Sequence, residues 1–234
     1  MHGEHTMTPE SDAGRAIAAA ARTINQSKSL DETLQTIAEV ARDSVPGFDQ
    51  VGISTVHKDG EVVTRAFAGD LVLRLDEVQY SLGEGPCVET LRSSDVALAP
   101  KIRQDKRWPR YVPEAVALGV QSQMAVKLYL DEQGTLGGIN FYSTTSDEVS
   151  PDAQALADLF AAHSAIALGH AYQRETLNQA LESRKVIGQA IGILMERYAM
   201  NEDRAFAFLV RASQQSNVKL RDIAQELVDQ RNSK

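Results

Sequence analysis

The sequence contains a single cysteine, Cys87, so no disulfide bond can form within the chain. It also lacks long hydrophobic segments, because its longest apolar runs, such as residues 16–21, are far too short to cross a bilayer. Residues 1–12 have neither the basic start nor the apolar core of a secretory signal. Together these absences predict a cytoplasmic protein without a membrane partner.

An excess of positive charge is missing as well. The net charge of −8 argues against an indiscriminate nucleic-acid binder. The charge is unevenly spread, since residues 181–234 contain nine Lys or Arg and seven Asp or Glu, whereas residues 1–180 contain fifteen and twenty-five. The resulting net charges of +2 and −10 indicate two segments with different partners, and the positive one is compatible with a small nucleic-acid contact.

The sequence shows no pattern typical of an enzyme. Its five histidines have no metal-ligand spacing with cysteine or carboxylates, and no Ser-His-Asp order, glycine-rich phosphate loop or paired-carboxylate motif stands out. We therefore predict a protein that is not an enzyme and that needs no metal and no cofactor. The 234 residues, 43% of them hydrophobic, are enough for one large or two smaller globular domains.

The spacing of apolar residues predicts an α+β fold in the first two thirds of the chain. Residues 1–11 are polar, and we expect them to be disordered. Helices are predicted at 12–26 and from Ser29 to the Pro46-Gly47 stop, where Ser29 and Glu32 have capping-box spacing. The segments that follow are strands at 50–57 and 61–67 around a turn at 58–60, helices at 69–80 and 87–93, a strand at 96–99, a polar loop at 101–111, a helical turn at 113–118, and strands at 123–130 and 136–142.

A different pattern begins at Ser150, which can cap a helix, with Pro151 in its first turn and no later proline. We predict one long helix over residues 151–198, weakest at Gly169 or Gly188; two ordinary helices with a joint are the alternative. A 3–4 spacing along it resembles a coiled coil, although three of the eight positions are polar, and predicts a homodimer. The positions of this seam are Leu156, Phe160, His163, Ala167, His170, Arg174, Leu177 and Leu181.

Two short helices are predicted to complete the chain. Asn201 can cap the first of them. The second covers about residues 219–230. The apolar residues that we expect on their inner faces are Ala205, Phe206, Leu209 and Ala212 in the first helix, and Leu220, Ile223, Ala224 and Leu227 in the second.

The order of elements up to the long helix resembles a GAF domain. Three local motifs are similar to signatures of GAF domains in bacterial signalling proteins, and they lie at residues 83–87 (GEGPC), 105–109 (DKRWP) and 137–142 (GGINFY). The resemblance covers residues 29–172, and with the preceding helix we assign residues 12–172 to a sensory domain. It implies an antiparallel sheet with flanking helices and a site for a small-molecule ligand. The alternative is a vestigial pocket in a domain that serves as a scaffold for dimerisation.

Three stretches of the remaining chain stand out, namely residues 184–197 (RKVIGQAIGILMER), residues 203–209 (DRAFAFL), and Ser213, Asn217, Lys219, Leu220, Arg221, Asp222, Ile223 and Ala224. They are similar to the first helix, the second helix, and the turn and third helix of an ANTAR domain, so the resemblance covers nearly the whole of that module. We therefore assign residues 173–234 to an all-α, three-helix domain whose first helix continues from the linker helix. The resemblance implies binding of paired RNA hairpins and prevention of transcription termination. Ile191 replaces a basic residue that many family members carry, which removes one phosphate contact.

This resemblance, together with residue type, predicts an RNA-binding surface. Unpaired bases stack on aromatic or guanidinium planes, and polar side chains contact phosphates or base edges. The predicted residues are Arg184, Lys185, Gln189, Ala190, Gly192, Arg197, Tyr198, Arg204, Arg211, Ser213, Gln214, Asn217, Lys219 and Arg221. Here Ala190 and Gly192 are expected to leave a low patch for RNA. The alternative is that Gly192 only allows close helix packing and that the basic residues form a solvated face.

A DNA-binding role is the second hypothesis. Residues 217–228 look like part of a helix-turn-helix, whose recognition helix needs several base-reading side chains. Arg221 is one, but Asp222 and Glu226 would repel phosphate. RNA is therefore favoured over DNA.

For the sensory domain, position alone suggests a ligand pocket lined by Cys87, Trp108, Tyr111, Met124 and Asn140. Trp108 is expected to be a structural plug rather than a surface for ligand stacking. Cys87 opens a short helix, which could lower its thiol pKa and make it a redox sensor, but a buried core role is favoured. The sequence predicts a signal-regulated RNA-binding antiterminator, and it leaves open the signal, the target transcripts and the resting state of the switch.

Overall fold

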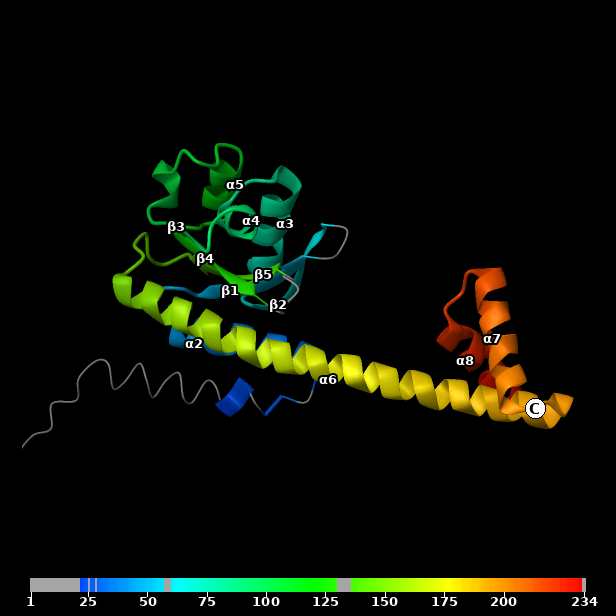
Figure 1. Cartoon of the computed structure of the whole chain (residues 1–234). Coiled ribbons are helices and arrows are strands. Elements are labelled where there is room, and N and C mark those ends of the chain that lie inside the picture. Colours follow the sequence, from blue (N-terminus) through cyan, green and yellow to red (C-terminus); the bar gives the residue numbers. More distant parts are fainter. Residues whose placement is uncertain (1–21, 25, 28, 57–59, 130–135, 233–234) are drawn as a thin grey trace, which may run out of the picture. The chain divides into compact units, whose positions relative to one another are not determined.

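The computed structural model describes residues 22–24, 26–27, 29–56, 60–129 and 136–232. The chain divides into two compact units, one of residues 1–172 and one of residues 173–234 (Figure 1). The disorder expected for residues 1–11, most of the helix expected at 12–26, and most of the turns expected at 58–60 and 131–134 lie outside the described residues.

A five-stranded sheet forms the centre of the first unit. Its strands are β1 (Gln50–Val56), β2 (Val62–Ala68), β3 (Val96–Ala99), β4 (Ser122–Tyr129) and β5 (Leu136–Ser143). They are antiparallel throughout, in the order β2-β1-β5-β4-β3. The strands fall where alternating apolar residues predict them, and the α+β fold class is confirmed.

One face of the sheet is covered by α2 (Leu30–Ser44) and the first part of α6 (Pro151–Tyr198). Ser29 caps α2 by accepting a hydrogen bond from the Glu32 amide at 3.1 Å, as the capping-box spacing predicts. On α6 the residues in contact with the core are mostly small, which lets the helix lie close to the sheet. They are Ala153, Ala157, Phe160, Ala161, Leu168 and Ala171.

The opposite face carries α3 (Val72–Leu82), α4 (Pro86–Arg92), the short 3-10 helix η1 (Ile102–Gln104) and α5 (Tyr111–Ala117). α3 packs tightly against Gly52 on β1, because a Cβ there would lie 2.6 Å from Cγ1 of Val72 and 3.0 Å from Oδ2 of Asp76. Any side chain at residue 52 would therefore displace the Val72 or Asp76 side chain. This second layer is more polar than the first and holds the buried groups described below.

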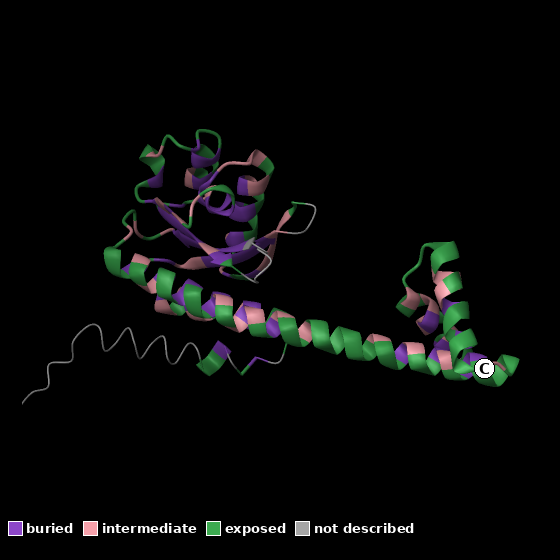
Figure 2. Ribbon diagram, viewed as in Figure 1, coloured by how far each residue is buried: buried purple, intermediate pink, exposed green. Residues whose placement is uncertain are grey.

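The long helix α6 runs unbroken over 48 residues, through both Gly169 and Gly188. The Oγ atom of Ser150 accepts a hydrogen bond from the Ala153 amide at 3.1 Å and so caps the helix as predicted. The predicted seam needs correction, because Phe160 is 3% exposed and belongs to the core of the first unit, and Leu156 and Ala167 pack against that core. From Gln173 to Lys185 the helix has no buried residue (Figure 2).

The second unit consists of the end of α6, α7 (Glu202–Ser216) and α8 (Leu220–Asn232). Asn201 caps α7 by accepting a hydrogen bond from the Arg204 amide, and Asn217 ends it in the left-handed conformation with φ 53°. The predicted inner face of α7 was partly wrong, since Phe206 is 45% exposed. Among the described residues, no helix is long and apolar enough to cross a membrane.

Candidate functional site

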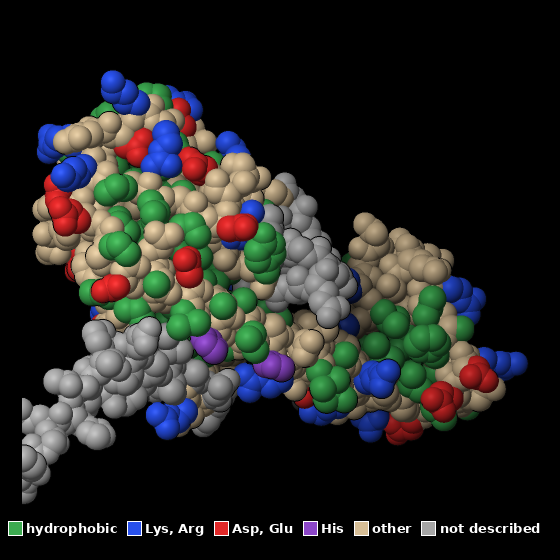
Figure 3. Space-filling view, turned by 60° about the vertical axis from the view of Figure 1, so that its left-hand side comes forward, with side chains coloured by type: hydrophobic (Ala, Val, Ile, Leu, Met, Phe, Trp, Pro, Cys, Tyr) green, Lys and Arg blue, Asp and Glu red, His purple; other side chains and the backbone are tan. Residues whose placement is uncertain are grey.

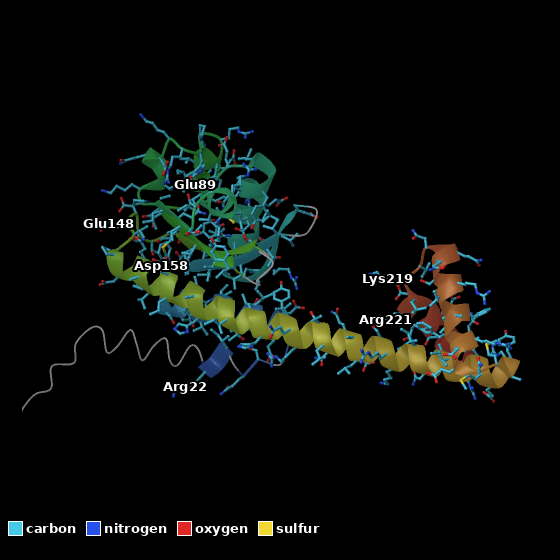
Figure 4. All side chains as sticks on the ribbon, viewed as in Figure 1. Arg22, Glu89, Glu148, Asp158, Lys219 and Arg221 are labelled. Carbon is cyan, nitrogen blue, oxygen red and sulfur yellow. The ribbon has the colours of Figure 1, made fainter. Side chains whose placement is uncertain are left out.

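Exposed polar and basic residues lie on all three helices of the second unit, and together they are called the basic surface. Twelve of the residues predicted to bind RNA are exposed. They are Arg184, Lys185, Gln189, Gly192, Arg197 and Tyr198 on α6, Arg204, Arg211 and Gln214 on α7, and Asn217, Lys219 and Arg221 at or beside the start of α8. Figure 4 shows Lys219 and Arg221 close together at that start.

Two of the predicted RNA contacts need correction. Ala190 has no exposed surface and lies in the hydrophobic core of the second unit, so it cannot face RNA. Ser213 is half-buried, and its hydroxyl donates a hydrogen bond to the Val218 carbonyl at 2.6 Å. Ser213 therefore closes the turn between α7 and α8 rather than offering a free donor.

Gly192 fits the predicted low patch better than the alternative of close helix packing. A Cβ at this position would meet no atom within 4 Å, so packing does not require a glycine here. The space beside the backbone is open, which lets another molecule approach the helix there.

Most cations of this surface lack an acidic partner. Nζ of Lys185 lies 3.7 Å from Oε2 of Glu182, and Nη1 of Arg231 lies 2.5 Å from Oε2 of Glu196. Within the described ranges, no ion pair involves the remaining Lys and Arg side chains of this surface, which are Arg184, Arg197, Arg204, Arg211, Lys219 and Arg221. Their charge is free to attract an anion.

Exposed aromatic rings accompany these cations. Tyr198 was predicted and is 58% exposed, but Phe206 and Phe208, at 45% and 47%, were missed. Figure 3 shows hydrophobic side chains gathered on the second unit with Lys and Arg beside them. The signal for Phe208 was present in the sequence, since it stands four residues after Arg204 and three before Arg211.

A buried polar cluster lies in the first unit, between the sheet and α3 and α4. Its centre is Asp76, which has no exposed surface. The Asp76 carboxylate accepts hydrogen bonds from Thr64 Oγ1 at 2.6 Å, from Asn140 Nδ2 at 3.2 Å and from the Tyr142 hydroxyl. The other members are Ser54, Gln79, Tyr80, Cys87, Tyr111 and Gln123.

The donors that surround Asp76 are neutral. Burial raises the pKa of Asp76 to about 6, and its hydrogen bonds, above all the one from Thr64, only partly offset that effect. Asn140 adds a second feature, because its Oδ1 is buried without a hydrogen-bond partner in the described structure. The cluster is thus an incompletely satisfied polar site inside the unit.

Cys87 belongs to this cluster and not to the surface. It is fully buried, and its amide donates a hydrogen bond to Gln79 Oε1 at 3.0 Å. Burial raises the pKa of the thiol to about 12, with the Asp76 charge adding to the effect. The pKa of the thiol is therefore raised and not lowered as hypothesised for the helix start, because burial removes the hydration of the thiolate.

The predicted ligand pocket is brought together only in part. Tyr111 and Asn140 meet the polar cluster, and Trp108 packs in the adjacent core at 5% exposure with the Arg107 guanidinium 4.1 Å from its ring centre. The prediction that Met124 lines the pocket is wrong, since this residue lies in the core on the opposite face of the sheet. Within the described ranges, no group of three His, Cys, Asp or Glu could hold a metal ion.

Comparison with known families assigns both units. Residues 27–169 match the GAF domain, and residues 175–228 match the ANTAR domain. GAF domains are regulatory modules, and ANTAR domains are RNA-binding modules of antitermination. No curated protein sequence matches this chain.

Solved structures share the fold of the first unit. The bacteriophytochrome RpBphP3 from R. palustris aligns with a TM-score of 0.57 at 15% identity, over 82% of this chain and 43% of that chain. A free methionine-R-sulfoxide reductase from Neisseria meningitidis aligns at 0.57 and 14% identity, over 74% and 99%, and the GAF domain of an Acinetobacter phosphoenolpyruvate-protein phosphotransferase at 0.57 and 15%, over 73% and 99%. The chain spans less than half of the phytochrome, and at these identities the likeness concerns the fold alone.

Proposed function

Because the chain belongs to the GAF domain family and carries an ANTAR domain behind its GAF domain, we propose that it is a signal-regulated transcription antiterminator. In this proposal the ANTAR domain, residues 173–234, binds paired hairpins in leader transcripts, and residues 12–172 form the sensory domain. The protein acts in the cytoplasm, where the transcripts are made, and it performs no chemical reaction of its own.

The observation that carries the proposal is the set of exposed Lys and Arg side chains without acidic partners on the second unit. Cations left unpaired in the free protein can pair with phosphates and release counterions when RNA binds. An exposed Tyr198 beside Arg197 adds planes on which unpaired loop bases can stack. The open backbone at Gly192 supports close approach of a loop.

We further infer that two copies of the chain pair through α6. A helix segment with no buried residue gains nothing from tertiary packing, yet Leu177 and Leu181 in it are 61% and 54% exposed. Pairing of two such segments would bury these leucines and present two ANTAR domains to two hairpins. Holding both hairpins would stabilise an RNA fold that excludes the terminator.

The GAF domain is proposed to regulate RNA binding through α6, since this one helix contributes residues to the cores of both units. A ligand can shift such a helix only if it binds one arrangement better than the other. A coupling free energy of roughly 1–3 kcal/mol between ligand binding by the GAF domain and RNA binding by the ANTAR domain would change RNA affinity about 5- to 150-fold.

Crosslinking in living cells, followed by sequencing of the bound nucleic acid, tests the function. We expect leader RNAs with two adjacent hairpins upstream of a terminator. A variant that carries both Lys219→Ala and Arg221→Ala is the control, and it should no longer recover these leader RNAs. Recovery of DNA instead of RNA would contradict the proposal and favour a helix-turn-helix regulator, for which the exposed Asp222 and Glu226 of α8 are unfavourable.

A further inference from the structure

The exposed aromatic residues of α7 are not equivalent, although they are almost equally accessible. Phe206 and Phe208 are 45% and 47% exposed and stand two positions apart, so their side chains lie on different sides of the helix. Nearly half of each side chain is accessible, so each ring has apolar surface available for contact with another molecule. What surrounds each ring decides what kind of molecule that can be.

Phe208 is flanked by cations. Arg204 precedes it by four residues and Arg211 follows it by three, so all three side chains share one exposed side of α7. Gln215, one turn further along, continues this side, which carries no carboxylate from α7. Neither arginine forms an ion pair anywhere in the described parts of the chain.

Phe206 has the opposite surroundings. Glu202 precedes it by four residues and Asp203 by three, and both are exposed in the first turn of α7. These carboxylates would repel a phosphate backbone near the Phe206 ring. The same helix thus offers one aromatic ring in a cationic setting and one in an acidic setting.

We propose that Phe208 is a base-stacking residue: its ring packs against an unpaired base of an RNA hairpin loop while Arg204 and Arg211 hold the flanking phosphates. This inference rests on the proposed RNA-binding function and adds a specificity-determining residue to it. An aromatic ring flanked by guanidinium groups combines the two contacts that single-stranded nucleic acid requires, a π-face for the base and cations for the backbone. A protein partner would need carboxylates opposite both arginines. Such ion pairs would not require an aromatic ring between the two arginines.

The test compares Phe208→Leu with Phe206→Leu in the full-length protein. Leucine keeps an apolar side chain but removes the ring, and the nearly equal exposure of the two positions makes them matched controls. The probe is the tandem-hairpin RNA that the unmodified protein enriches most strongly from a pool with randomised loops. A blunt RNA duplex with the same stem sequence is the second probe.

We expect F208L to weaken binding of the hairpin RNA about 5- to 150-fold, the range for loss of one base–aromatic stack. Its salt dependence should stay unchanged, because no charge is removed. F206L should bind within about twofold of the unmodified protein and F208W within about threefold, since neither change removes the Phe208 stack. Binding of the blunt duplex should be insensitive to all three substitutions.

The outcomes separate the two levels of the proposal. If the unmodified protein enriches no hairpin RNA, the proposed function fails and the Phe208 inference fails with it. If it enriches one but F208L binds that RNA equally well, only the inference fails. If F208L and F206L lose RNA affinity equally, or if F208W binds as weakly as F208L, the stacking inference is overturned in favour of a structural role for Phe208. The inference would also be overturned if F208L bound RNA normally but supported less antitermination in transcription assays with purified RNA polymerase. That result would indicate that Phe208 contacts the polymerase.

Discussion

Asn140 on β5 donates a hydrogen bond from Nδ2 to Oδ1 of Asp76 on α3 at 3.2 Å, while its own Oδ1 has no partner in the described structure. The contact joins the sheet to the helix that covers it. A buried carboxylate held only by neutral donors keeps part of its desolvation cost, which is why the pKa of Asp76 rises to about 6. The sensory unit therefore contains a polar site that stabilises the fold less than apolar packing would.

Removal of the Asp76 charge should change how stability depends on pH. The folded pKa of about 6 exceeds the unfolded value of 3.8, so the contribution of this group is fully present below pH 4 and lost as pH rises through 6. Asp76→Asn should abolish that loss, which amounts to up to about 3 kcal/mol between pH 4 and pH 7. Urea denaturation of the full chain at several pH values measures it. Glu77→Gln, on the same helix but exposed, is the control, and parallel pH curves for D76N and the unmodified protein would contradict the prediction.

Cys87 should react with thiol reagents only after the first unit unfolds. It is fully buried and its pKa is raised to about 12, so both access and the thiolate fraction are low at neutral pH. We expect iodoacetamide labelling in native buffer to be far slower than in denaturant, as followed by intact-mass spectrometry. Fast labelling of the native protein would revive the redox-sensor hypothesis.

Lys219→Ala should weaken RNA binding and reduce the slope of log affinity against log salt by about one counterion, because one phosphate contact is lost. Gly192→Glu should weaken it more, since it adds bulk and negative charge where the backbone is open. Arg103→Ala, an exposed cation of the first unit, is the charge-matched control and should have no effect. Unchanged affinity in both folded variants, measured by fluorescence anisotropy, would exclude this surface as the RNA contact.

The double substitution Leu177→Glu with Leu181→Glu should convert a dimer into a monomer. Both side chains are exposed in the single chain, so their replacement should leave each unit folded, whereas unpaired charges in a paired seam would cost several kcal/mol. Light scattering should report about twice the mass of one chain for the unmodified protein and for the control Asn178→Glu with Gln179→Glu. A double mutant that stays dimeric would move the contact elsewhere, with residues 12–45 as the next candidate.

Insertion of alanines after Asn178 should change RNA affinity periodically if the GAF domain acts through α6. Each inserted residue turns the following part of the helix by about 100°, so two residues should disturb the phase and four should nearly restore it. The measurement is the affinity of the full chain for a two-hairpin RNA with zero to four insertions. Equal affinity across the series would show that helix phase is not controlled and would contradict the regulatory proposal.

The sequence alone was sufficient for the elements and for the family. Alternation marked the strands, Ser29, Ser150 and Asn201 marked helix starts, and the absence of proline after Pro151 allowed the 48-residue helix. These features are local, because backbone propensity and capping depend on residues within one or two turns. The exposure of the Lys and Arg side chains of the ANTAR domain was also predictable, because unpaired charged side chains are rarely buried.

Tertiary structure decided which apolar and polar residues face each other. Met124 pairs with Phe141 across β4 and β5, and this register turns Met124 away from Asn140 and the polar cluster. Packing of neighbouring helices likewise buried Ala190 and Phe160 but left Phe206 and Phe208 exposed. Periodicity places residues on a common face, but it does not say which face will meet a neighbour, because that depends on contacts between segments far apart in the chain.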